Sequence, residues 1–306
     1  MVEVARVRSF NRTVTQRVGA LQDEYLSRGR PLGASRVLWE IGEDATDVRA
    51  LRARLDLDSG YLSRLLRSLE RDGLIVVGSD RADKRVRTAR LTAAGRVERR
   101  LLDRRSDELA RSLLAPLSAD SRERLVEAMG VVERLLTAGL VEVTIEDPRS
   151  AAARFCLESY FAELNDRFDT GFDPSRAIPA NADELTEPAG LLLVARLHGE
   201  PIGCGALKLH GDVPFYIKRM WVAPDARGLG VGRRILHELE DHARRCGADV
   251  VHLETNKALD EAASLYRSAG YVEVDAFNDE PYAHHWFKKR LSPARGHPRR
   301  ARAAPR

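Results

Sequence analysis

Three glycines at alternate positions, Gly228, Gly230 and Gly232, separate an apolar segment from a helical pattern in WVAPDARGLGVGRRIL, residues 221–236. Glycine lets the backbone approach a ligand closely and turn its N–H groups outward. A helix that starts directly after the loop adds its unpaired N–H groups and the positive end of its dipole. This order of residues therefore predicts a cradle for a pyrophosphate group.

The spacing of the glycines indicates which class of pyrophosphate-containing ligand the loop would bind. A Walker loop requires Gly-Lys-Ser/Thr after its first glycine, and this sequence has none. The dinucleotide motif Gly-x-Gly-x-x-Gly does not fit either, because the third glycine comes one residue too early. The loop does match Arg-x-x-Gly-x-Gly, at Arg227, Gly230 and Gly232. In this it resembles the acetyl-CoA loop of the GNAT N-acetyltransferases.

Residues 141–290 resemble that family along their whole length. VHLETNKALDEAASLYRSAGYVEV, residues 251–274, looks like the strand and helix that follow the loop in the family, where an asparagine and a tyrosine recur. The resemblance implies a mixed, mostly antiparallel twisted sheet with flanking helices, and transfer of acetyl from acetyl-CoA to a primary amine. It assigns cofactor binding to these residues: Met220, Trp221, Val222, Arg227, Gly228, Leu229, Gly230, Val231, Gly232, Asn256 and Tyr266.

The resemblance also implies catalytic roles. Tyr266 would protonate the departing thiolate as a general acid, and the Val222 N–H would stabilise the oxyanion. Many relatives carry a glutamate on the strand before the loop, but FYIKRMWV, residues 215–222, has none. Glu254 is the best substitute as general base, and His252 would point to the same side of its strand. Alternatively, Tyr266 is a core residue and Asn256 caps a helix.

The missing strand glutamate leaves a second function open. In that alternative the chain is a transcriptional regulator whose second domain binds acetyl-CoA or a small molecule and catalyses nothing. Direct transfer in a ternary complex is expected if it is an enzyme, because none of the three cysteines lies near the loop. No metal site is expected, since adjacent strand residues such as His284 and His285 face opposite sides.

The first half of the chain carries a different pattern. TDVRALRARLDLDSGYLSRLLRSLERDGL, residues 46–74, predicts a helix from Thr46 to Leu55, a short turn, and a second helix from Ser59 to Arg71. Asp58 or Ser59 can cap the second helix, and Gly73 can end it. Leucines form one stripe of this helix, and its other side carries hydroxyl, aromatic and guanidinium groups suited to a DNA groove.

A charged hairpin follows, and LIVVGSDRADKRVRTARLTAAG, residues 74–95, continues the pattern. The run of residues 58–95 resembles the MarR-type winged helix-turn-helix regulators. That resemblance implies a homodimer, built from the N-terminal and last two helices of this half, on a double-stranded operator. The expected DNA-binding residues are Ser59, Tyr61, Ser63, Arg64, Arg67, Arg81, Lys84, Arg85 and Arg87.

Charge and composition support a division into two domains and a tail. Residues 1–140 hold 27 Lys and Arg against 21 Asp and Glu, whereas residues 141–290 hold 18 against 25. A basic first half favours a polyanion partner. We expect a DNA-binding and dimerisation domain at 1–140, an acetyltransferase domain at 141–291 and a disordered basic tail at 292–306. The three cysteines are odd in number and widely spaced, which favours the cytoplasm. No apolar run reaches the length of about 20 residues that a membrane span needs.

Overall fold

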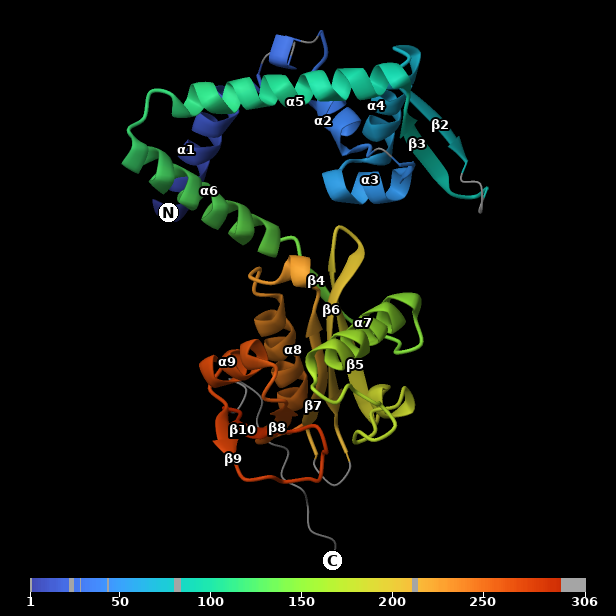
Figure 1. The fold of residues 1–306 in the computed structure, drawn as a ribbon, viewed down its shortest axis with the longest axis vertical. Coiled ribbons are helices and arrows are strands. Elements are labelled where there is room, and N and C mark those ends of the chain that lie inside the picture. The colour runs from blue at the N-terminus through green and yellow to red at the C-terminus, as the bar shows by residue number, and fades with distance from the viewer. Residues whose placement is uncertain are drawn as a thin grey trace, which may run out of the picture. The chain divides into compact units, whose positions relative to one another are not determined.

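The computed structural model describes residues 2–21, 25–27, 29–42, 44–79, 84–210 and 214–292. The chain divides into two compact units, Met1–Val131 and Val132–Arg306, which are described separately (Figure 1). This division lies inside a helix, so the expected boundary at residue 140 stays a proposal. Nearly all of the expected tail, residues 293–306, lies outside the described residues. No helix in the described ranges is long and apolar enough to cross a membrane.

The first unit is mainly helical, with a small sheet at one end (Figure 1). Its elements are α1 Val2–Arg17, the 3-10 helix η1 Tyr25–Ser27, α2 Leu32–Glu40, β1 Thr46–Asp47, α3 Val48–Leu55, α4 Ser59–Arg71, β2 Ile75–Ser79, β3 Arg87–Leu91, α5 Ala93–Leu114 and α6 Ala119–Ala138. The strands pair in the order β1-β3-β2. This is the winged helix-turn-helix arrangement that the sequence predicts.

The leucine stripe of α4 forms the centre of this unit's core. Leu62, Leu65, Leu66 and Leu69 are buried, as their spacing predicts, and they pack with residues of α2 such as Val37 and Leu38. Asp58 caps the helix by accepting a hydrogen bond from the Tyr61 N–H at 2.8 Å. These contacts fix which side of α4 faces outward.

One boundary prediction is wrong. The helix expected from Thr46 begins at Val48, because Asp47 is extended and its carboxylate caps the helix, accepting from the Arg49 N–H at 2.7 Å. Thr46 and Asp47 instead form β1 and pair with Ala89 and Thr88 of β3. The predicted hairpin is therefore part of a three-stranded sheet.

The start of α5 is packed tightly against the turn that follows α4. The Thr92 hydroxyl caps α5 at the Gly95 N–H and donates to the Gly73 carbonyl at 2.7 Å. A Cβ placed on Gly95 would lie 1.9 Å from the Leu74 carbonyl oxygen. The glycine of LTAAG is thus required by close approach of the backbone.

The second unit is a seven-stranded sheet covered by helices. Its elements are β4 Glu142–Glu146, α7 Ala151–Arg167, η2 Asp183–Leu185, β5 Gly190–Leu197, β6 Glu200–Lys208, β7 Tyr216–Val222, η3 Pro224–Ala226, α8 Val231–Arg245, β8 Val250–Thr255, α9 Asp260–Ser268, β9 Val272–Val274 and β10 His285–Arg290. The strand order is β4-β5-β6-β7-β8-β10-β9, and β7 and β8 are the parallel neighbours. This confirms the predicted mixed, mostly antiparallel α/β fold.

Helices α7 and α8 cover opposite faces of the sheet. Leu192 and Val194 of β5 pack with Ala153 and Cys156 of α7. The alternate residues Leu191 and Leu193 pack instead in a larger core with residues of α8 such as Ile235 and Leu239. This division follows from the two-residue period of a strand.

The central strands depart from regular pairing at two places. On β7, Arg219 and Met220 oppose the single residue Gly205 of β6, and Arg219 has a left-handed φ of 58°. Towards β8, the paired residues are Tyr216 and His252, after which the two strands diverge. A bulge and a divergence side by side leave the end of β7 without a strand partner on one edge.

We expect Gly95→Ala to destabilise the N-terminal unit by about 1–3 kcal/mol, because the new methyl group would meet a main-chain oxygen that cannot move cheaply. Helix propensity alone predicts the opposite, a gain in stability, because alanine favours a helix more than glycine does. Gly78→Ala is the control, since nothing lies within 4 Å of its Cβ position. Calorimetric melting of the full chain should show a loss only for Gly95→Ala, and equal melting of the two variants would contradict the packing.

Candidate active site and nucleic-acid interface

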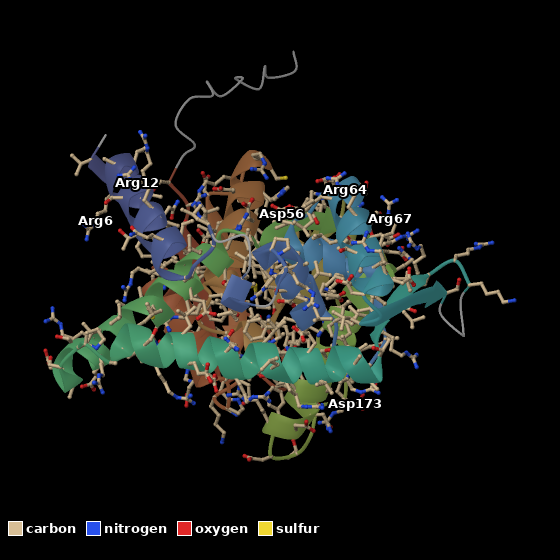
Figure 2. All side chains as sticks on the ribbon, turned by 90° about the horizontal axis from the view of Figure 1, so that it is seen from above. Arg6, Arg12, Asp56, Arg64, Arg67 and Asp173 are labelled. Atoms are coloured by element: carbon tan, nitrogen blue, oxygen red, sulfur yellow. The ribbon has the colours of Figure 1, made fainter. Side chains whose placement is uncertain are left out.

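The outward side of α4 presents basic and hydroxyl groups. Arg64 and Arg67 are exposed and project away from the helix (Figure 2), and Ser59 is exposed at its first turn. Ser63 is partly buried, and its carbonyl accepts from the Arg67 Nε at 3.3 Å. Such groups can contact phosphates and base edges in a groove.

Tyr61, which was expected to bind DNA, packs partly against the core of its unit. It is partly buried against the core, and a Cβ placed on Gly33 would lie 2.6 Å from its hydroxyl. The Arg64 guanidinium lies 5.6 Å from the centre of its ring. Tyr61 therefore supports Arg64, and its own contact with DNA stays a prediction.

The hairpin of β2 and β3 carries the other expected DNA contacts. The strands pair in register from Ile75↔Leu91 to Ser79↔Arg87. Lys84, Arg85 and Arg87 are exposed near its tip, whereas Arg81 lies outside the described residues. A basic tip on a two-stranded ribbon can reach DNA phosphates or the minor groove.

The glycine loop of the second unit has the backbone that its sequence predicts. Gly228 and Gly230 have φ of 83° and 76°, in the left-handed region that favours glycine, and nothing lies within 4 Å of a Cβ built on either. Gly230 precedes α8 without a side-chain cap, so the first N–H groups of the helix stay available to a ligand. Gly232 lies inside α8, where a Cβ would come within 3.3 Å of Leu265.

The end of β7 offers main-chain groups to the same side. The Ala223 N–H donates to the Ile202 carbonyl of β6 at 2.9 Å. Because neighbouring N–H groups of a strand point to opposite edges, the Val222 N–H points away from β6. It faces the space that the divergence of β7 and β8 leaves open.

A cavity of about 490 Å³ occupies that space. Met220, Trp221 and Val222 line one side, the loop from Arg227 to Gly232 lines its end, and α9 closes the other side with residues such as Leu265 and Tyr266. Nearly all of the expected cofactor-binding residues thus surround one cleft; Leu229 and Asn256 do not line it. The cleft combines an apolar wall with unpaired main-chain donors, as a site for a pantetheine arm and a pyrophosphate would require.

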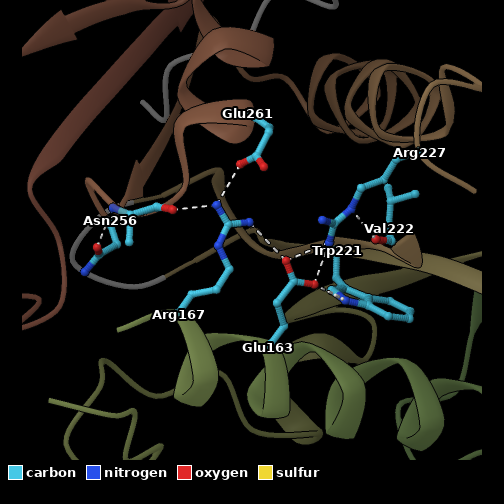
Figure 3. Close-up of polar contacts among 8 residues, drawn as sticks. Glu163, Arg167, Trp221, Val222, Arg227, Asn256 and Glu261 are labelled. Atoms are coloured by element: carbon cyan, nitrogen blue, oxygen red, sulfur yellow. Dashed lines mark hydrogen bonds and ion pairs between the residues drawn. The ribbon is translucent and has the colours of Figure 1, made fainter. Parts of the chain in front are cut away.

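A polar cluster that the sequence did not reveal lines part of the cleft (Figure 3). Both Glu163 carboxylate oxygens accept from the Arg227 guanidinium at 2.6 Å, and one also accepts from the Trp221 indole at 3.0 Å. Arg167, one turn later on α7, pairs with Glu163 at 3.2 Å and with Glu261 at 2.8 Å. The Arg227 side chain therefore braces the loop. The i, i+4 spacing of Glu163 and Arg167 was the available signal.

Tyr266 lies where this cleft meets a second, smaller cavity. It is 4% exposed and lines both spaces, and its ring packs against Tyr271 and Phe287. Burial raises the pKa of Tyr266 above its ordinary value, so its hydroxyl stays protonated at neutral pH. A protonated hydroxyl at this junction can act as a general acid.

Asn256 is held by the chain itself. Its side-chain amide donates to the Tyr282 carbonyl at 2.7 Å, and its oxygen accepts from the Ala258 N–H at 2.8 Å. The second bond closes the turn before α9, and the alternative of a helix cap is wrong, because the N-cap of α9 is Leu259 and it has no side-chain cap. Asn256 also lines the smaller cavity, so its expected contact with a cofactor stays a prediction.

The two candidate general bases, Glu254 and His252, lie in different cavities. Glu254 lines the smaller cavity beside Tyr266, and its carboxylate lies 3.4 Å from the Lys218 ammonium. Burial raises the pKa of Glu254, and Lys218 opposes this shift. His252 lies against Phe277 in a different recess, at 5.3 Å between ring centres. The structure thus favours Glu254.

The adjacent histidines His284 and His285 do not line the cleft. His284 is exposed, and His285 pairs with Glu273 at 2.6 Å. Within the described ranges, no group of three or more His, Cys, Asp or Glu side chains is placed to hold a metal ion.

Comparisons with known proteins agree with both halves of this picture. The acetyltransferase (GNAT) family model matches residues 157–271, and the MarR family model matches residues 28–86. The N-alpha-acetyltransferase RimI of Mycobacterium tuberculosis is 34% identical over 142 residues, which are 45% of this chain and 84% of that protein. Both family resemblances seen in the sequence are thereby confirmed.

Two further matches cover parts of the chain. The IAA acetyltransferase of Azospirillum brasilense is 38% identical over 99 residues, which are 32% of this chain and 63% of that protein. The match thus spans less than two thirds of that relative. The crystal structure of Streptococcus pneumoniae FabT in complex with DNA covers 44% of this chain and 96% of its own, with 20% identity and a TM-score of 0.39.

The raised pKa of Glu254 predicts a pH-dependent stability. A folded-state pKa above the ordinary 4.5 means that the folded protein binds this proton more tightly than the unfolded chain does. Stability is therefore lost as pH rises from about 4.5 through the raised value. The melting temperature of Glu254→Gln, minus that of the wild type, should increase over this range and then level off. A difference that stays constant or shrinks would show that Lys218 outweighs burial.

Proposed function

We propose that this chain, which belongs to the GNAT acetyltransferase family and also carries a MarR-family domain, transfers acetyl from acetyl-CoA to a primary amine and binds an operator in double-stranded DNA. The observation that supports the transferase is the cleft between β7 and β8. It joins the edge of Met220–Val222 and the glycine loop to Tyr266 and, through the adjoining cavity, to Glu254.

The residues around the cleft fit acetyl-CoA. Main-chain N–H groups of Gly228 and of Gly230 to Gly232 would hold its pyrophosphate, because those of Arg227 and Leu229 donate to carbonyls within the loop. The free edge of Met220–Val222 would pair with its pantetheine arm as an added strand would. Bound acetyl-CoA would supply an activated acetyl group. Glu163 would keep the loop in place through Arg227.

The transfer is direct, within a ternary complex. Glu254 takes a proton from the ammonium group of the acceptor, whose nitrogen then forms a bond to the thioester carbonyl carbon. The Val222 N–H stabilises the negative charge on the carbonyl oxygen. The carbon–sulfur bond breaks, and Tyr266 donates its proton to the sulfur. The acylated nitrogen then loses its second proton, which restores the Tyr266 hydroxyl, and Glu254 releases its proton to solvent. The products are the N-acetyl amine and the free thiol, with one proton released overall.

A regulator that only senses acetyl-CoA is the second candidate, favoured by the absence of a glutamate on β7. The placement of Tyr266 at the junction of the two cavities, with the Glu254 carboxylate in the smaller one, favours the enzyme, because it puts a proton donor and a candidate base beside one reaction centre. Tight acetyl-CoA binding without transfer to any amine would support the sensor.

We expect Tyr266→Phe to lower turnover by about 100-fold or more while leaving the acetyl-CoA dissociation constant nearly unchanged, because the variant loses only the acid. Tyr271→Phe is the matched control: its hydroxyl is also buried, but Tyr271 lines neither the cleft nor the smaller cavity. Steady-state kinetics and calorimetry measure the two quantities. Unchanged turnover in Tyr266→Phe would remove this residue from the mechanism.

The same chain acts as a dimeric DNA-binding regulator in our proposal. Helices α1 and α6 have no buried residue, yet both expose large apolar side chains, including Val7, Phe10, Val126 and Met129. A second copy would cover these surfaces. A two-fold dimer would place two α4 helices in successive turns of the major groove.

We expect Arg64→Ala and Lys84→Ala to weaken DNA binding in different ways. Arg64 on α4 is placed to read base edges, so its loss should relax sequence preference at one position by about 1–3 kcal/mol. Lys84 on the hairpin would neutralise a phosphate, so its loss should weaken all sequences alike and reduce the salt slope by about 1. Fluorescence anisotropy on operator variants at several salt concentrations measures both. Identical effects of the two substitutions would contradict this division.

A further inference from the structure

The smaller cavity beside Tyr266 is lined by buried polar groups whose hydrogen bonding is incomplete. Arg219 Nε, Glu254 Oε2 and Glu280 Oε1 are buried without a hydrogen-bond partner, and all three residues line this cavity of about 70 Å³. Arg219 is 7% exposed, and the side chains of Glu254 and Glu280 are 8% and 6% exposed. Leaving such groups unpaired costs stability, so their convergence points to a ligand that completes them.

The charges in this cavity are separated into two unbalanced sides. Glu254 and Glu280 share one cation, the Lys218 ammonium, at 3.4 and 3.2 Å. Arg219 has no carboxylate partner among the described residues; its guanidinium lies over the Phe161 ring at 4.8 Å. One side thus has a carboxylate in excess and the other a guanidinium in excess.

The bulge on β7 creates this arrangement. Successive side chains of a regular strand point to opposite faces, yet Lys218 and Arg219 both line the same cavity. The left-handed φ of 58° at Arg219 changes the direction of the strand at that residue. Bulges of this kind re-aim a side chain next to a site.

We propose that the acceptor is a free amino acid or an equally small aminocarboxylic acid. This inference rests on the proposed acetyl transfer. The carboxylate of the acceptor pairs with Arg219, and its ammonium group lies against Glu280 and Glu254, which then takes the proton. The Phe168, Phe172 and Tyr282 rings line the cavity and receive an apolar side chain. An arginine fork facing a carboxylate is a strong, orienting contact.

The test compares acceptors that differ only in the carboxylate. The pairs are L-alanine with ethylamine, L-methionine with 3-methylthiopropylamine, and L-phenylalanine with phenethylamine, each given to the full chain with acetyl-CoA. At least one amino acid should have a kcat/KM about 100-fold or more above that of its decarboxylated partner, because a site built for a polar group rejects analogues that lack it.

Substitution of Arg219 then ties this preference to one side chain. Arg219→Met should bring the two members of a pair within about threefold of each other, and Arg219→Lys should restore part of the preference. Melting temperature and acetyl-CoA affinity, measured on each variant, show that the fold and the cleft are intact. If neither variant folds, the wild-type ratio alone decides.

The outcomes separate this inference from the function on which it rests. Decarboxylated amines, or an amidated tripeptide offered as a protein N-terminus, that react as well as the amino acids would overturn the inference and leave the transferase intact. Acetyl-CoA binding without transfer to any amino acid of the panel would also contradict it. Absence of acetyl-CoA binding would instead refute the transferase.

Discussion

The separation of β7 from β8 after Tyr216 and His252 is the constraint on which the catalytic half depends. A sheet normally satisfies every main-chain N–H and C=O of its inner strands, and an unsatisfied edge inside a domain is costly. Here the edge of Met220–Val222 opens into a cavity of about 490 Å³. The main-chain groups on this edge of β7 therefore have no strand partner, and the first N–H groups of α8, beside them, have no side-chain cap.

The surrounding residues keep this opening from closing. Glu163 and Arg167 on α7 tie that helix to Trp221, to the loop at Arg227 and to α9 at Glu261. The Gly205 position lets α8 pack against the bulge, since a Cβ there would lie 2.5 Å from Ile235 and 2.7 Å from Met220. Helices on both faces of the sheet therefore hold β7 in its irregular path, and the irregular path in turn directs Lys218 and Arg219 into one cavity.

The sequence predicted the parts of this architecture that arise from local patterns. Apolar periodicity located α4 and α8, and the spacing of Arg227, Gly230 and Gly232 located the loop, because these features depend on residues near one another in the chain. The start of α3 was misplaced, because the pairing of Thr46 with Ala89 outweighs a local helical preference. Glu163, Glu280 and Arg219 were missed because their positions depend on the bulge and on contacts between residues far apart in the chain, up to the 102 positions between Ile178 and Glu280. Two local signals were present: the i, i+4 spacing of Glu163 and Arg167, and the adjacent Lys218 and Arg219, which are charged residues inside an apolar strand.

The central claim is that the free edge of β7 and the glycine loop hold acetyl-CoA through main-chain groups. A crystal structure of the full chain with acetyl-CoA tests it most directly. The account predicts pantetheine amides hydrogen-bonded to Met220–Val222, pyrophosphate oxygens on the N–H groups of Gly228 and Gly230–Gly232, and the thioester sulfur beside the Tyr266 hydroxyl. A coenzyme bound elsewhere, or a cleft filled by the protein's own side chains at saturating acetyl-CoA, would contradict it.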